Sequence, residues 1–183
     1  AGDALQTIAF ELINNEASTL TDKQARKISL KLAQSAGAIG MVSGQILDIQ
    51  ATAKALTLAQ LENVHQRKTG ALINAAVMCG AFCGDTVGKQ HLVKLNDYAN
   101  KIGLAFQVVD DILDIESTTE ELGKPRGSDL ALGKSTYPAL IGLSESKQLA
   151  ENLYQDSIAS VASISDNTQL LEDLAELVVK RKK

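Results

Sequence analysis

The segment from residue 103 to residue 115, Gly-Leu-Ala-Phe-Gln-Val-Val-Asp-Asp-Ile-Leu-Asp-Ile, constrains the fold more than any other part of this sequence. On a helix, positions i, i+3, i+4 and i+7 share one face. Here those positions carry the four polar side chains of the segment, Gln107, Asp110, Asp111 and Asp114. The other positions are apolar or small, and a helix that is apolar nearly all round is a buried one. We therefore predict a buried helix whose polar stripe faces an interior cavity.

The carboxylates of this stripe need positive charge nearby, because an isolated ionised group is costly to bury. No Lys, Arg or His occurs between Lys101 and Lys124 to supply it. A solvated acidic face would normally alternate with basic residues, whereas aliphatic side chains flank this stripe. Hard oxygen ligands that leave room for phosphate groups suit Mg²⁺. We predict that Asp110, Asp111 and Asp114 hold this ion.

The composition of the chain favours helices. Aromatic residues make up 3% of the 183 residues, Trp is absent and there are two Pro, which leaves few residues that favour strands. Capping boxes at Thr21-x-x-Gln24 and Thr57-x-x-Gln60 predict two helix starts. Helices joined by short connectors predict one all-α domain over residues 1–183, a bundle of antiparallel helices.

Hydrophobic periodicity places the helices along the chain. The first covers residues 1–13 and is expected to turn an apolar stripe to the core, made of Leu5, Ile8, Ala9, Leu12 and Ile13. Further helices are expected from 21 towards 50, from 57 to about 84, over 87–115, near 137–138, over 146–163 and over 168–182. Residues 117–133 form the one long connector, and such a connector in a compact domain is often a functional lid.

Three further pairs of polar residues are candidates for the same cavity: Lys68 with Thr69, Gln45 with Asp48, and Lys124 with Lys134. The first pair lies in the middle of a predicted helix, and the second lies one turn apart on another. The lysines of the third pair follow glycines within and after the long connector. Each pair also has an ordinary explanation. Lys68 can extend to solvent, the second pair can be satisfied by polar neighbours, and the third can be solvated.

The charge and hydropathy of the chain exclude some functions. The net charge of −4 and the pI near 5.2 argue against nucleic-acid binding as the main role. No apolar run reaches the length of a membrane span, and no signal peptide is recognisable. We expect a cytoplasmic protein without a membrane span.

Together these motifs resemble the short-chain trans-isoprenyl diphosphate synthases, and the bacterial farnesyl diphosphate synthases most closely. The resemblance runs from Ala-Gly-Asp-Ala-Leu-Gln at residues 1–6 to Gly-Lys-Ser-Thr-Tyr-Pro at residues 133–138. Its most specific elements are Lys-Thr-Gly at 68–70 and Phe-Gln-x-x-Asp-Asp-x-x-Asp at 106–114, the second aspartate-rich motif of that family. Gly-Gln-x-x-Asp at 44–48 and Gly-Lys at 123–124 complete it.

This resemblance implies the isoprenoid-synthase fold, in which α-helices surround a deep central cavity, and usually a homodimer. The implied reaction is the condensation of an allylic diphosphate (dimethylallyl or geranyl) with isopentenyl diphosphate to farnesyl diphosphate, in isoprenoid biosynthesis. The allylic diphosphate ionises with the help of Mg²⁺, and the double bond of isopentenyl diphosphate attacks the allylic cation. Loss of a proton then restores an alkene.

The resemblance also implies roles for individual residues. Asp110 would bind Mg²⁺ directly, with Asp111 and Asp114 in or near the coordination shell. Contacts to diphosphate oxygens would come from Lys68, Lys124 and Lys134. The remaining candidates would line the cavity: Thr69 and Gln107 towards the carbocation, Phe106 against the prenyl tail, and Gln45 and Asp48.

Two elements of that family are not found in residues 1–183. These are the first aspartate-rich motif and the N-terminal basic residues that hold isopentenyl diphosphate. Both would precede residue 1, so we expect the sequence to be the C-terminal two-thirds of a polyprenyl synthase domain, incomplete at its N-terminus. We also expect that this portion alone does not catalyse prenyl transfer.

Two alternatives stay open at this point. Glu62-x-x-His65 has the spacing found in ferritin-like di-metal bundles, although that class needs the pattern twice together with two more glutamates. The other alternative is a non-catalytic prenyltransferase-like subunit or scaffold that has lost half of its site.

Overall fold

The computed structural model describes residues 1–52, 54–84, 88–116, 133–164 and 167–181. Within these residues the regular structure is entirely helical, which confirms the predicted fold class. The elements are α1 (Gly2–Ile13), α2 (Asp22–Ala36), α3 (Met41–Ala51), α4 (Leu58–His65), the π-helical turn η1 (Gln66–Gly70), α5 (Ala71–Cys83), α6 (Lys89–Glu116), α9 (Tyr137–Ile141), α10 (Leu143–Val161) and α11 (Gln169–Lys180). Most of the predicted lid, including Lys124, lies outside the described residues.

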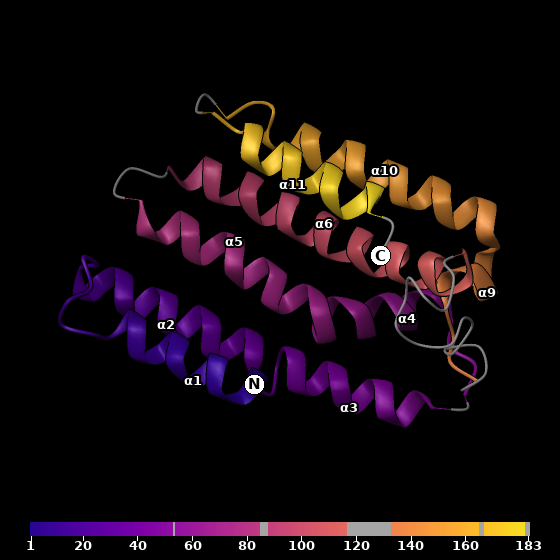
Figure 1. Ribbon diagram of the computed structural model, residues 1–183, viewed down its shortest axis with the longest axis horizontal. Helices are drawn as coiled ribbons and strands as arrows, with labels where there is room; N and C mark the ends of the chain where they lie inside the picture. The colour runs from indigo at the N-terminus through magenta and orange to yellow at the C-terminus, as the bar shows by residue number, and fades with distance from the viewer. Residues whose placement is uncertain (53, 85–87, 117–132, 165–166, 182–183) are drawn as a thin grey trace.

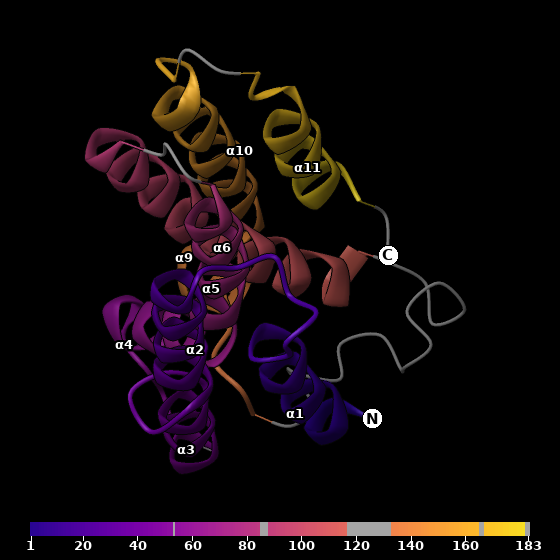
Figure 2. The ribbon, with the colours of Figure 1, turned by 90° about the vertical axis from the view of Figure 1, so that its left-hand side faces the viewer.

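The long helix α6 occupies the centre of the bundle (Figure 1). It packs most extensively against α10 and α5, and also against η1, α11 and α9. In Figures 1 and 2, α5 and α10 lie on either side of α6, and α2 lies beyond α5. Among the described residues no helix is long and apolar enough to cross a membrane.

Both predicted capping boxes are present. The hydroxyl of Thr21 accepts from the backbone N–H of Gln24, and Thr57 does the same with Gln60. In each box the glutamine side chain accepts in return from the backbone N–H of the threonine, at 2.9 Å. These pairs satisfy N–H groups that the first turn of a helix otherwise leaves without partners.

The prediction of one helix from residue 21 towards residue 50 is wrong. The chain leaves the helical conformation at Gly37 and starts α3 after Gly40. A Cβ atom at Gly40 would lie 2.6 Å from the carbonyl carbon of Ser35. Glycine permits this tight change of direction, and the periodicity of the flanking helices carries no sign of it.

The first helix also differs from the prediction. Its apolar stripe was expected in the core, yet α1 has no buried residue, and Leu5 and Leu12 are each 65% exposed. The helix packs against α2, and of the stripe Ala9 and Ile13 are partly buried, while Leu5, Ile8 and Leu12 are exposed. The periodicity therefore predicted the helix correctly, and the burial of its apolar face wrongly.

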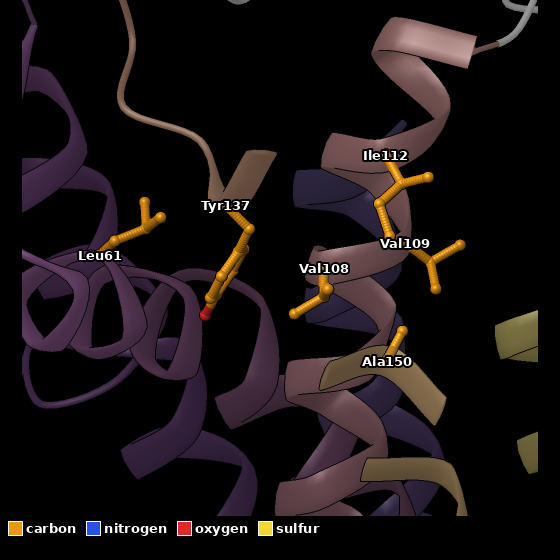
Figure 3. Packing of buried hydrophobic residues seen from close by; sticks show 6 residues of the cluster. All are labelled: Leu61, Val108, Val109, Ile112, Tyr137 and Ala150. Carbon is orange, nitrogen blue, oxygen red and sulfur yellow. The ribbon is translucent and has the colours of Figure 1, made fainter. Parts of the chain in front are cut away.

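A hydrophobic cluster ties α4, α6, α9 and α10 together. Its buried members are Leu61, Val108, Val109, Ile112, Tyr137 and Ala150. Figure 3 shows Tyr137 lying between Leu61 of α4 and Val108 of α6. Val108 and Tyr137 have no exposed surface. This cluster fixes the start of α9 against the face of α6 next to the polar stripe.

Helix α3 approaches η1 closely at Gly44. A Cβ atom at this position would lie 2.5 Å from Cα of Lys68 and 2.7 Å from the carbonyl carbon of Arg67. Both contacts are shorter than van der Waals separations, and both are to backbone, which cannot swing away. The glycine therefore sets the spacing between α3 and the helical turn that carries Lys68.

We predict that Gly44→Ala destabilises the protein by roughly 1–3 kcal/mol, the usual cost of overpacking. The matched control is Gly80→Ala on α5, where a Cβ atom would meet nothing within 4 Å. That change should be neutral or stabilising by about 0.5–1 kcal/mol, because alanine favours the helix. Chemical denaturation gives both values. Equal stabilities for the two variants would show that α3 and η1 are not in such close contact.

Candidate functional site

A cavity of about 200 Å³ lies between α3, α4, α6 and the segment that enters α9. Its apolar wall includes Leu56, Leu61 and Val64. Six of the residues predicted from the sequence reach it: Asp48, Lys68, Gln107, Asp110, Asp111 and Lys134. Residues from four segments that are far apart in the sequence therefore converge at one place.

Lys68 is carried by the π-helical turn η1. Its ammonium group donates to Oδ2 of Asp48 on α3, at 2.6 Å. The two side chains are 34% and 27% exposed, so both lie in the cavity wall rather than in open solvent. Single π-turns within helices frequently occur at functional sites. This ion pair brings together one residue from each of two candidate pairs, Lys68–Thr69 and Gln45–Asp48. It argues against the alternative that Lys68 simply extends into solvent.

His65, the last residue of α4, links the same wall to α6. Its Nδ1 lies 2.8 Å from Oε1 of Gln107. Its ring stacks on that of Tyr137, with centroids 5.6 Å apart and planes inclined by 23°. The backbone N–H of Tyr137 donates to Oδ2 of Asp111 at 2.9 Å. The imidazole is thus held at one edge by Gln107 and on one face by Tyr137.

The second ring nitrogen of His65 is buried and has no hydrogen-bond partner. It lies 4.0 Å from Oδ2 of Asp111, a separation that would make an ion pair only if the imidazole were protonated. Burial lowers the pKa of His65 below its ordinary value, against a smaller raising effect of the hydrogen bond to Gln107. We therefore take His65 as neutral near pH 7 and do not count an ion pair with Asp111.

Asp110 has a cationic neighbour from the end of the chain. The guanidinium of Arg181, which follows α11, lies 3.3 Å from Oδ1 of Asp110 and donates to the carbonyl oxygen of Phe106 at 3.1 Å. It also lies over the ring of Phe106, 3.8 Å from the centroid. Asp110 is half exposed, while the Arg181 side chain is 16% exposed. The C-terminal helix is thereby fastened to the acidic stripe.

The other predicted residues are placed around the cavity without lining it. Asp114 is buried at 2% exposure, Thr69 is partly buried beside Lys68, and Gln45 is exposed on α3. Phe106 lies beneath Arg181. Among the described residues, no group of three or more His, Cys, Asp or Glu side chains converges as a ready-made metal site.

The contacts that His65, Tyr137 and Arg181 make at this site were not predicted from the sequence. A lone histidine, a tyrosine next to a proline and a basic chain end have common structural explanations. Arg181 is 71 residues from Asp110 in the sequence, so no local spacing connects them. The Gly-Lys-Ser-Thr-Tyr-Pro motif did contain Tyr137, although the contact of its backbone with Asp111 could not be foreseen.

The fold and the cavity define a class of protein. It is a helical bundle in which a buried central helix presents carboxylates to a cavity that also holds lysines. Such a cavity suits an anionic ligand accompanied by a cation.

Comparison with known proteins gives the family. Residues 1–172 match the Polyprenyl synthetase family, and the chain belongs to it. It is 44% identical over its whole length to farnesyl diphosphate synthase of Escherichia coli (strain K12), and 45% identical to that of Haemophilus influenzae. These matches cover 62% and 61% of the two relatives, so the chain spans about three-fifths of their length.

Solved structures agree with this assignment. A geranyltransferase from Helicobacter pylori, in complex with magnesium and isoprenyl diphosphate, superposes with a TM-score of 0.81 at 30% identity. An FPP/GFPP synthase from Zymomonas mobilis superposes with a TM-score of 0.83 at 31% identity. The matches cover 97% of this chain in both cases, and 57% and 59% of the two structures. The resemblance inferred from the motifs is confirmed at the level of the family.

The lowered pKa of His65 predicts how stability depends on pH. Above pH 6.5 the imidazole is neutral in both the folded and the unfolded state, so it causes no difference. As the pH falls below 6.5, the unfolded state takes up the proton first, and the free energy of unfolding decreases.

Denaturation of the parent and of His65→Gln at pH 7 and pH 5 checks this. The variant should lose less stability than the parent over this range, because it has no group to titrate at this position. Equal losses in the two proteins would show that burial does not lower the pKa of His65.

Proposed function

We propose that the complete gene product that contains these 183 residues is a trans-prenyltransferase. It joins an allylic diphosphate, dimethylallyl or geranyl, to isopentenyl diphosphate and forms farnesyl diphosphate. The observation that carries this proposal is the meeting of Lys68 and Lys134 with Asp110 and Asp111 at one cavity, in a member of the polyprenyl synthetase family. The names of the relatives support the same chemistry.

In this reaction the C–O bond of the allylic diphosphate breaks, and the diphosphate leaves with the electron pair. The π electrons of isopentenyl diphosphate then form a new C–C bond to the allylic carbon. A proton leaves the adjacent carbon, and a double bond is restored. The protein must therefore neutralise a departing polyanionic group and tolerate a transient cation without offering it a nucleophile.

The donor set at the cavity fits Mg²⁺. This ion keeps several waters and is commonly held by one or two carboxylates together with substrate phosphates, so a complete protein cage is not needed. Asp110 and Asp111 would hold it, with Asp114 supporting them from the next turn. When bound, Mg²⁺ would stabilise the negative charge that develops on the diphosphate.

The side chains of the chain itself would bind and orient the substrate. Lys68 and Lys134 reach the cavity as point charges suited to diphosphate oxygens, and Lys124 is a further candidate outside the described residues. Lys68 would then exchange part of its contact with Asp48 for the diphosphate. The amide of Gln107 and the hydroxyl of Thr69 would place dipoles near the carbocation. Asp48 would stay in the cavity wall beside Lys68.

A homodimer belongs to the same proposal. The uncovered apolar stripe of α1 and Leu30 of α2, which is 57% exposed, are candidates for its interface. Exposed apolar patches of this kind commonly mark association surfaces.

We predict that Asp110→Asn reduces turnover by orders of magnitude while leaving the fold intact, because it removes a charge that acts on the ionisation step. The assay supplies geranyl diphosphate, isopentenyl diphosphate and Mg²⁺ to the complete gene product and measures farnesyl diphosphate. Asp156→Asn, an exposed position on α10, is the control and should keep the parent turnover. If Asp110→Asn turns over like the parent at saturating Mg²⁺, Asp110 has no part in the mechanism. A parent that forms no prenyl product would overturn the proposed function.

Lys68 can be tested by binding alone. We predict that Lys68→Met weakens binding of a bisphosphonate by roughly 1.5–3 kcal/mol, the range of a hydrogen bond to a charged group. The control is Lys147→Met, which removes an ion pair of the same length, 2.6 Å to Glu116, on the surface between α10 and α6. Calorimetric titration should show a weaker affinity for the first variant alone. Parent-like affinity in Lys68→Met would show that Lys68 does not bind the diphosphate and only forms part of the cavity wall.

A further inference from the structure

We propose that His65 is a positioning residue that fixes the side-chain amide of Gln107 in the cavity, through a frame that it shares with Tyr137. The proposal rests on the prenyl-transfer function proposed above and deepens it, because it assigns a role to a residue outside the motifs. The function needs the amide dipole of Gln107 in one orientation, and the structure shows what holds it there.

Gln107 needs such support. Its side chain has three rotatable bonds, and a glutamine without an anchor loses rotamer entropy when it is held in a single conformation. The hydrogen bond of 2.8 Å from His65 restricts it before any substrate arrives. An amide oxygen has two lone pairs, so one remains available to the cavity while the other accepts from His65. A dipole fixed in advance stabilises charge without reorganisation during the reaction.

The direction of this hydrogen bond determines the state of the imidazole. The partner atom on Gln107 is the amide oxygen, which can only accept. Nδ1 of His65 must therefore carry a proton. For a neutral ring, Nε2 is then an acceptor, and it is the buried nitrogen that lacks a partner. At 4.0 Å from the Asp111 carboxylate it makes no hydrogen bond.

His65 is itself held firmly enough to serve as an anchor. Its side chain is 13% exposed, and it stacks on Tyr137, which is fully buried in the cluster with Leu61 and Val108 (Figure 3). The backbone N–H of Tyr137 fixes Oδ2 of Asp111. His65 and Tyr137 together thus fix the positions of the Gln107 amide and the Asp111 carboxylate. Sites that are supported in this way keep their geometry to within fractions of an ångström.

Substitution of His65 by asparagine or by glutamine distinguishes the positioning role of His65 from simple packing. The amide nitrogen of Asn is separated from Cα by the same number of bonds as Nδ1 of His, so His65→Asn keeps the donor to Gln107. The amide nitrogen of Gln corresponds instead to Nε2, so His65→Gln keeps a polar group of similar size and loses that donor. The control is His91→Gln, which changes the other histidine of the chain, at the start of α6 and outside the cavity.

Steady-state kinetics on the complete gene product should show a fall in kcat of about tenfold or more for His65→Gln, with KM for geranyl diphosphate changed by about twofold or less. His65→Asn should stay within about threefold of the parent kcat, and His91→Gln should match the parent. In a Gln107→Leu background, His65→Gln should cause no further fall, because its effect passes through Gln107. Equal falls for His65→Asn and His65→Gln, or falls that multiply in the double variant, would overturn the proposal.

A measurement that does not need catalysis separates this proposal from the proposed function. Two-bond ¹H–¹⁵N correlation spectra at pH 8 show which ring nitrogen of His65 carries the proton. The parent should show the proton on Nδ1, and Gln107→Leu should shift it to Nε2, the form that free neutral histidine prefers. A proton on Nε2 in the parent would overturn the positioning role. If the parent has the proton on Nδ1 but no prenyl-transfer activity, the positioning role of His65 is supported and the proposed function is wrong.

Discussion

The burial of α6 is the constraint on which the rest of this structure depends. This helix packs against α4, η1, α5, α9, α10 and α11, and Ala105 and Val108 have no exposed surface at all. A helix enclosed to this extent can present polar side chains only where the surrounding helices leave a space. The cavity beside α3 and α4 is such a space. Lys68 and Lys134 reach it, and Arg181 lies beside Asp110, so each of these charges is opposite in sign to the acidic stripe.

Contacts between the surrounding elements place the side chains around this cavity. Gly44 allows α3 to lie against η1, so that Asp48 and Lys68 form an ion pair of 2.6 Å in the wall. The start of α9 brings Tyr137 against α6, where its backbone binds Asp111. The end of α11 brings Arg181 to Asp110. Each contact joins segments that are distant in the sequence, and the last two are made to α6 itself.

Much of the fold could be predicted from the sequence because its signals are local. The spacing of four polar residues identified α6 as a buried helix, and hydroxyl–glutamine pairs marked the starts of α2 and α4. The break at Gly37–Gly40 was missed, since the periodicity continues in register on both sides of it. The exposed stripe of α1 was misjudged for another reason: periodicity shows which face is apolar and says nothing of what covers it.

The site could be predicted only in part, because motifs in the sequence show only some of the residues that meet in the folded protein. Lysine, aspartate and amide positions were recognisable from motifs, and the structure brings six of them to one cavity. His65 and Arg181 act through contacts across 42 and 71 residues, with Gln107 and Asp110. Such contacts follow from helix packing, and no spacing in the sequence encodes them. A single histidine or a basic residue after a helix is common in proteins without any part in a site, so neither residue type pointed to these contacts.

We propose that the acidic stripe and the two lysines bind a metal–diphosphate unit in this cavity. The test is a crystal structure of the complete gene product with Mn²⁺ in place of Mg²⁺ and a non-hydrolysable allylic thiolodiphosphate. We expect anomalous density for Mn²⁺ at Asp110 and Asp111, with the diphosphate oxygens within hydrogen-bond distance of the Lys68 ammonium group. Diphosphate bound away from Lys68, or metal density away from both aspartates, would contradict it.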